Sequence, residues 1–179
     1  MIRIIAGIYK GRFLKIPDSS VTRPTMDKVR QAIFNALKDK TQGSVCVDLF
    51  AGSGAMGLEA LSRGAKQVYF NDKDRKTFQV MKENILSLKP SEDCYVMALS
   101  DYRLFLKKYS DIKFDLVFLD PPYRFNINSV IIEEMVERNM LNDDAVIVSE
   151  QEKENPEIEG FAMKEYKYGQ KHVAIYRKA

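Results

Sequence analysis

A regular alternation of strand-like and helix-like segments between residues 44 and 119 restricts the fold more than any other feature. Apolar, β-branched runs at about 44–49, 67–71, 94–99 and 114–119 are separated by helical patterns near 55–63, 74–87 and 101–109. Strands joined through helices pair in parallel, and right-handed crossovers place helices on both faces of the sheet. The pattern therefore predicts a doubly wound α/β sheet.

The C-terminal part of the chain extends this sheet. A helix near 127–138 precedes the apolar run "AVIVSE", and the tail "FAMKEYKYGQKHVAIYRK" predicts two strands joined at Gly169 and Gln170. Two strands joined by so short a turn pair antiparallel. The prediction is a mostly parallel, seven-stranded sheet with an antiparallel C-terminal hairpin, accompanied by a small N-terminal β-hairpin.

Residues 1–40 form a basic segment ahead of the sheet. "IRIIAGIYKGRFLKIP" predicts the N-terminal hairpin, and "RPTMDKVRQAIFNALKD" predicts a helix with Thr25 as its N-cap. Nine lysines and arginines stand against three aspartates here, so this segment carries +6 and the remainder −3 of the net charge of +3. Such a distribution is typical of a segment that binds a polyanion, with a solvated lysine-rich surface as the plain alternative.

Length and composition exclude several classes of protein. A chain of 179 residues predicts one main domain, and no apolar run approaches the ~20 residues of a membrane span, so a cytoplasmic protein is expected. Cys46 and Cys94 lack metal-ligand spacing and are expected to be buried thiols in a reducing compartment. Because His172 is the only histidine, neither a Ser-His-Asp triad nor a histidine-rich metal site is expected.

The loop after the first core strand, "DLFAGSGAMG", has the G-x-G-x-x-G spacing at Gly52, Gly54 and Gly57. Such glycines allow a tight turn and a close approach of backbone to ligand, which suits a nicotinamide dinucleotide as well as other ligands. Asp48, at the end of the strand, would repel a pyrophosphate and attract a sulfonium or an ammonium group. S-adenosylmethionine carries both positive charges, which makes it the favoured cofactor.

Acids after the next two strands are candidates for further cofactor contacts, because open α/β sheets bind ligands beyond the carboxyl ends of their strands. In "YFNDKD", Asp72 is expected to accept hydrogen bonds from ribose hydroxyls, while Asp74 is expected to cap the following helix. Asp101 either accepts from an adenine amino group, with Tyr102 beside the ring, or only caps its helix. The sequence leaves both roles of Asp101 open.

The motif "DPPY", Asp120 to Tyr123, follows the fourth strand and is the clearest sign of chemistry in the chain. Two prolines cannot continue a strand and hold the backbone rigid, so a stiff turn alone would explain them. If Asp120 and the carbonyl of Pro121 accept the two N–H bonds of an exocyclic amine, the nitrogen lone pair is directed at an incoming methyl group. Tyr123 would then stack on a single-stranded or flipped-out base, which is worth ~1–3 kcal/mol.

With these motifs in place, the sequence resembles the class I S-adenosylmethionine-dependent methyltransferases, and among them the small-subunit ribosomal RNA guanine-N2-methyltransferases of the RsmD type. The resemblance runs along essentially the whole chain, through "RIIAG", "KGRFL", "RPTMDKVRQAIFN", "DLFAGSGAMGLEALSRGA" and "LDPPY". The chain departs from the family at Gln31, where a Glu is more usual, and at "FNDKD", where the family more often has a Glu before the lysine-acid pair.

The resemblance implies a Rossmann-like class I methyltransferase domain over residues 41–179 and an RNA-binding extension over residues 1–40. The implied activity is methylation of one loop guanine of 16S ribosomal RNA on its exocyclic N2 amine, in naked RNA or the assembled small subunit. Apart from the resemblance, a monomer is expected because a self-contained sheet needs no partner, and no metal is expected because the single histidine and the two cysteines offer no metal-ligand spacing. The implied residues are Asp120, Pro121, Pro122 and Tyr123 for catalysis; Asp48, Phe50, Gly52, Ser53, Gly54, Gly57, Asp72, Asp101 and Tyr102 for S-adenosylmethionine; and Arg3, Lys10, Arg12 and Arg23 for RNA.

Other functions stay open on the sequence. The motif "DPPY" also occurs in methyltransferases of DNA adenine, although this chain has little room for a separate target-recognition region. Methylation of protein glutamine usually relies on a motif that begins with Asn, whereas Asp120 stands here. Another RNA substrate, a non-catalytic RNA-binding factor and a dinucleotide oxidoreductase are the remaining alternatives.

Overall fold

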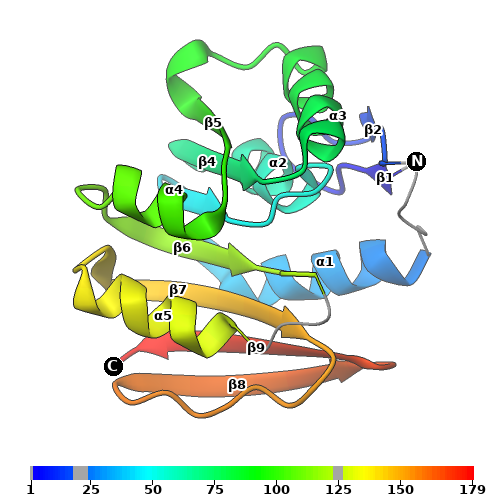
Figure 1. The fold of residues 1–179 in the computed structure, drawn as a ribbon. Coiled ribbons are helices and arrows are strands. Elements are labelled where there is room, and N and C mark those ends of the chain that lie inside the picture. Colours follow the sequence, from blue (N-terminus) through cyan, green and yellow to red (C-terminus); the bar gives the residue numbers. More distant parts are fainter. Residues whose placement is uncertain (1, 18–23, 123–126) are drawn as a thin grey trace.

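The computed structural model of the protein describes residues 2–17, 24–122 and 127–179 (Figure 1). The helices of this part are α1 (Pro24–Leu37), α2 (Ala55–Ser62), α3 (Arg75–Ser87), α4 (Tyr102–Lys108) and α5 (Asn128–Glu137), with 3-10 turns η1 (Lys38–Lys40) and η2 (Glu92–Cys94). The strands are β1 (Ile2–Arg3), β2 (Phe13–Leu14), β3 (Val45–Asp48), β4 (Gln67–Asp72), β5 (Tyr95–Leu99), β6 (Phe114–Leu119), β7 (Leu141–Gln151), β8 (Phe161–Tyr168) and β9 (Lys171–Lys178).

Seven strands form the main sheet in the order β5-β4-β3-β6-β7-β9-β8. The first five in this order pair in parallel, so that their carboxyl ends share one edge. β9 runs antiparallel between β7 and β8. The chain moves outward from β3 to β5 and returns to β6, so the strand order reverses between β3 and β6, which is the point where such sheets bind ligands.

Each side of the main sheet is covered by its own set of helices (Figure 1). One buried cluster joins α1, α2 and α3 to the strand residues Cys46, Val68, Phe70, Leu116, Phe118, Val146 and Val148. A second joins α4 and α5 to Val47, Tyr69, Val117, Leu119 and Ile147. Successive strand residues alternate between the two clusters, which is the period-two pattern of a strand buried on both sides.

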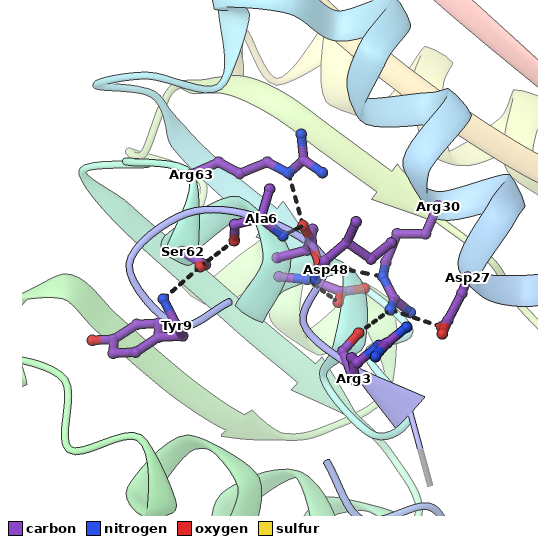
Figure 2. Close-up of polar contacts among 11 residues, drawn as sticks. Arg3, Ala6, Tyr9, Asp27, Arg30, Asp48, Ser62 and Arg63 are labelled. Atoms are coloured by element: carbon purple, nitrogen blue, oxygen red, sulfur yellow. Dashed lines mark hydrogen bonds and ion pairs between the residues drawn. The ribbon is translucent and has the colours of Figure 1, made fainter. Parts of the chain in front are cut away.

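The N-terminal hairpin of β1 and β2 is docked on α2 through a buried carboxylate. Glu59 of α2 has no exposed surface, and its two oxygens accept hydrogen bonds from the backbone N–H groups of Ile5 and Ala6 at 2.9 and 3.1 Å. Arg63 Nε donates to the same carboxylate at 2.8 Å, and Arg30 Nε lies 3.5 Å from it (Figure 2). A charge buried in this way is stable only because cations and N–H donors surround it.

A second set of contacts fixes the tip of the hairpin on the end of α2. Ser62 Oγ donates to the carbonyl of Ala6 at 2.6 Å and accepts from the N–H of Tyr9 at 2.9 Å (Figure 2). Gly7, at φ +84°, lies so close that a Cβ there would come within 1.8 Å of the Ser62 carbonyl oxygen. The backbone path of the hairpin therefore requires glycine at this position.

The sequence predicted these elements correctly, with two local differences. α1 begins at Pro24, so Thr25 lies inside the first turn and does not cap the helix; proline is favoured at the first helical position because its φ is preset and its missing N–H has no partner to lose. Cys46 is buried, but Cys94 is partly exposed, because η2 leads into the edge strand β5. None of the described helices is long and apolar enough to cross a membrane.

Candidate active site

The carboxyl ends of the parallel strands border one cavity of about 1260 Å³. The residues predicted from sequence that line it are Asp48, Phe50, Gly52, Ser53, Asp72, Asp101, Tyr102, Asp120, Pro121 and Pro122. The fold thus brings the glycine loop and the DPPY motif to a single site. The volume exceeds the ~300–1,000 Å³ of an ordinary small-molecule pocket, which leaves room for a second ligand beside a cofactor. Tyr123 lies outside the described residues.

The glycine loop turns from β3 into α2 by means of left-handed backbone. Gly52 and Gly54 have φ values of 57° and 84°, which side-chain-bearing residues rarely adopt. Gly57 serves a different purpose, since a Cβ there would lie 2.3 Å from the ring of Phe70 on β4. Its absence of a side chain lets α2 pack close to the sheet, as predicted. Gly54 and Gly57 therefore shape the loop from behind the cavity wall.

Asp48 is a buried acid at the end of β3. The residue is only 4% exposed, and its Oδ2 accepts a hydrogen bond from the N–H of Gly57 at 3.0 Å. The pKa of Asp48 is raised to about 7; burial is the main cause, the hydrogen bond from Gly57 opposes it, and the charge of Asp120 contributes to the rise. An acid in such a state gains from a cationic ligand, because a nearby positive charge favours its ionised form.

Asp72 and Asp74 have different roles, and Asp74 caps a helix as the sequence predicted. Asp74 Oδ1 accepts from the N–H of Thr77 at 2.7 Å and so caps α3. Asp72 faces the cavity, and its carboxylate accepts from the N–H of Gly52 at 3.0 Å and of Asp74 at 2.9 Å. The Asp72 carboxylate therefore holds the end of β4 against the glycine loop. Its contact with a ribose stays a prediction.

Asp101 caps α4, and its Oδ1 accepts from the N–H of Arg103 at 2.9 Å. It also lines the cavity, so the cap does not decide whether it contacts adenine as well. Tyr102 is buried and its ring lies 6.0 Å from that of Phe50, centroid to centroid. These two rings, one from the loop after β3 and one from the start of α4, give the cavity an aromatic wall.

Asp120, at the end of β6, lies in a cluster of charges at the other end of the cavity. Lys171 Nζ on β9 is 3.5 Å from Asp120 Oδ2 and 2.9 Å from Oε2 of Glu150 on β7. Burial, followed by the charge of Glu150, raises the pKa of Asp120, and Lys171 lowers it. Although the Asp120 side chain is 39% exposed, its exposed surface faces the cavity.

Sequence reasoning missed four polar residues that hold this site together: Asn71, Asn84, Glu150 and Lys171. The Asn71 amide donates to the carbonyls of Leu49 and Ser100, which ties together the ends of three strands. Asn84 of α3 donates to the carbonyls of Ser53 and Lys15, joining the glycine loop to the segment after the hairpin. Asn71 and Glu150 lie at the ends of apolar strands, and a polar residue at that position was the sequence signal that could have identified them as site residues.

The basic residues proposed for RNA contact sit on the hairpin. Arg3, Lys10 and Arg12 are exposed, and Arg12 Nη2 donates to the carbonyl of Ser87 at 2.9 Å. Phe13, 63% exposed, stands among them. Arg23 lies outside the described residues. Within the described segments, no group of three or more metal-ligating side chains comes together.

Comparison with known proteins decides the family. The family described as "Conserved hypothetical protein 95" matches residues 2–177. The chain belongs to this family. It is 41% identical over 158 residues to "Ribosomal RNA small subunit methyltransferase D" of Haemophilus influenzae, covering 88% of this chain and 82% of that protein. The protein of the same name from Escherichia coli strain K12 is 40% identical over 154 residues, covering 86% and 76%.

The fold has close counterparts among solved structures. The Escherichia coli protein yhhF superimposes with a TM-score of 0.89 at 35% identity, covering 99% of this chain and 97% of that one. The RsmD-type resemblance and the α/β fold with its N-terminal hairpin are thereby confirmed. Because the match includes β1 and β2, the hairpin belongs to the shared fold.

Proposed function

We propose that the protein transfers the methyl group of S-adenosylmethionine to the exocyclic N2 amine of a loop guanine in 16S ribosomal RNA. The observation that carries this proposal is the single cavity that joins the buried acid Asp48 to Asp120 and the two prolines beside it. The names of the relatives, ribosomal RNA small subunit methyltransferases at 40–41% identity, support the substrate class.

The wall around Asp48 suits S-adenosylmethionine, which supplies an electrophilic methyl group on a sulfonium. Asp48 is buried beside Gly57, whose N–H is the one donor to its carboxylate among the described residues, so a cationic ligand would supply the charge that stabilises this carboxylate. We assign Asp72 to the ribose hydroxyls, and Phe50 and Tyr102 to the adenine ring. A pyrophosphate, the alternative ligand of a glycine loop, would meet Asp48 and Asp72 as like charges.

The DPPY end of the cavity suits an amine whose lone pair is delocalised into a base. Asp120 and the Pro121 carbonyl accept its two N–H bonds, which frees the lone pair to point at the methyl group. Holding the two reactants in line supplies ~7–11 kcal/mol of the barrier. Transfer forms an N–C bond and breaks an S–C bond, whose electron pair stays on sulfur. One proton then leaves the nitrogen, and Asp120, with its raised pKa, can accept it.

RNA would enter across the hairpin. Arg3, Lys10 and Arg12 supply positive charge, and exposed Phe13 offers a ring on which a base can stack. The docking of the hairpin on Glu59 keeps this surface at a fixed distance from the cavity. We further propose that the protein acts as a cytoplasmic monomer, since the sheet and both clusters are complete within one chain.

The test is methylation with labelled S-adenosylmethionine. The protein is incubated separately with unmethylated small ribosomal subunits, their naked RNA, duplex DNA and total protein, and each product is digested to nucleosides or amino acids. Label in N2-methylguanosine from ribosomal RNA is the expected result. Label in adenine or in protein would contradict the proposed substrate, and binding of RNA without transfer of any label would contradict the proposed enzymatic role.

A further inference from the structure

A second carboxylate lies next to Asp120 and is held by one lysine. Lys171 Nζ donates to Glu150 Oε2 at 2.9 Å and contacts Asp120 Oδ2 at 3.5 Å. The side chain of Glu150 is 9% exposed, that of Lys171 is 23% exposed, and all three residues line the cavity. The end of β6, the end of β7 and the start of β9 thus meet in a cluster of two acids and one base.

The position of Glu150 is one where packing alone would favour an apolar residue. It continues the row of Val146 and Val148, which lie in the cluster beneath α1, and it pairs across to Val173 of β9. A carboxylate here is desolvated and repels Asp120, an arrangement that destabilises the protein unless another group supplies donors. Lys171 supplies part of this stabilisation. A ligand with N–H donors would supply more.

Guanine has the donors that this pair of acids requires. Along its Watson–Crick edge, the 2-amine is followed by the N1–H donor and then by the O6 acceptor, whereas the N1 of adenine is an acceptor. A flipped-out base is recognised by hydrogen bonds to this edge. With the 2-amine on Asp120 and Pro121, a neighbouring carboxylate would accept the N1–H of guanine and repel the N1 lone pair of adenine.

We propose that Glu150 reads the N1–H of the target guanine and is thereby the residue that selects guanine over adenine-like bases. Lys171 is a positioning residue, which acts by holding the carboxylates of Glu150 and Asp120 side by side. This inference rests on the proposed methyl transfer to an N2 amine and adds the residue that makes it specific.

The experiment uses RNA in which the target guanosine is replaced by 2,6-diaminopurine riboside. This base keeps the 2-amine that is methylated but has an acceptor at N1. The wild-type protein should methylate the RNA with guanosine at the target with a kcat/KM about 10- to 100-fold higher than the RNA with 2,6-diaminopurine riboside. Glu150→Gln should reduce this preference to within about threefold, because an amide can donate to N1 as well as accept from N1–H. Glu152→Gln, an exposed acid that also lines the cavity, is the matched control and should keep the wild-type preference.

Each outcome is decisive. An unchanged preference in Glu150→Gln, with normal binding of S-adenosylhomocysteine, would overturn the role of Glu150. A wild-type protein that methylates no guanosine at all would overturn the proposed function instead.

A measurement on the wild-type protein is independent of how the variant folds. RNA with inosine at the target keeps N1–H and cannot be methylated at position 2, so it should inhibit at least about tenfold more strongly than RNA with adenosine there. Equal inhibition would contradict the inference.

Discussion

Asp48→Asn should stabilise the protein progressively as pH rises, because it removes a carboxylate that the fold buries. Asp48 is 4% exposed, and burial raises its pKa from 3.8 to about 7. The only hydrogen bond that the structure gives its Oδ2 within the described residues comes from the N–H of Gly57, and the amide oxygen of Asn can accept the same bond. The substitution therefore changes charge with little change in shape.

The size of the effect follows from the two pKa values. Between them, the unfolded chain is ionised at this side chain while the folded protein keeps the proton, so the stability of the wild type falls as pH rises. Each pH unit corresponds to about 1.4 kcal/mol, so the wild type loses roughly 2–3 kcal/mol between about pH 5 and pH 7, and the variant avoids this loss. Above about pH 7 the difference stays constant.

Urea unfolding of the ligand-free proteins at about pH 5 and pH 8 measures the effect, and the matching shift in Tm is roughly 4–12 °C. The buried amide of Asn costs ~1–3 kcal/mol at every pH, so the informative quantity is the change of the difference with pH. Asp74→Asn is the control, because Asp74 is an exposed cap whose pKa is lowered by its hydrogen bonds to Thr77. If wild type and Asp48→Asn lost stability in parallel, Asp48 would already be ionised at low pH and the argument for a cationic ligand would fail.

Three further predictions concern activity. Asp120→Ala should abolish turnover and leave S-adenosylmethionine affinity within about threefold, since we propose that this side chain binds the target amine and not the cofactor. The wild-type kcat/KM should fall as pH drops through the raised pKa of Asp120; a flat pH profile, with unchanged turnover in the variant, would refute the role. Arg12→Glu should weaken RNA binding and lower the slope of log affinity against log salt by about one to two, with an unchanged slope excluding the hairpin from the RNA interface. Glu59→Gln breaks a buried ion cluster and should lower the free energy of unfolding by ~3–5 kcal/mol. It should also raise the KM for RNA more than the KM for S-adenosylmethionine. As a control, Glu83→Gln, which removes an acid on the surface, should change neither KM.

The sheet and the shared site could be predicted from the sequence because both follow from local patterns. Short apolar, β-branched runs between helical patterns indicated the strands, and the rule that parallel strands end at one edge placed Asp48 and Asp120 beside one crevice. The docking of the hairpin could not be predicted in this way. Glu59 binds backbone groups 53 and 54 residues away, and such a contact leaves no periodic signal in either segment. The same reason hid the pair of Glu150 and Lys171, which joins two strands across 21 residues.

The charged residues of this protein separate by what surrounds them. Glu59 is as buried as Asp48, but two guanidinium groups and two backbone N–H groups lie around its carboxylate, so its charge is compensated inside the fold. Among the residues that the structure describes, fewer donors surround Asp48 and Asp120, and burial raises the pKa of each. Acids of the first kind hold structure together, and acids of the second kind stay ready for a ligand that brings the missing positive charge or N–H donors. The two kinds stand in neighbouring elements here: Glu59 fixes the hairpin surface that we propose for RNA binding, and Asp48 and Asp120 line the cavity where the proposed reaction would take place.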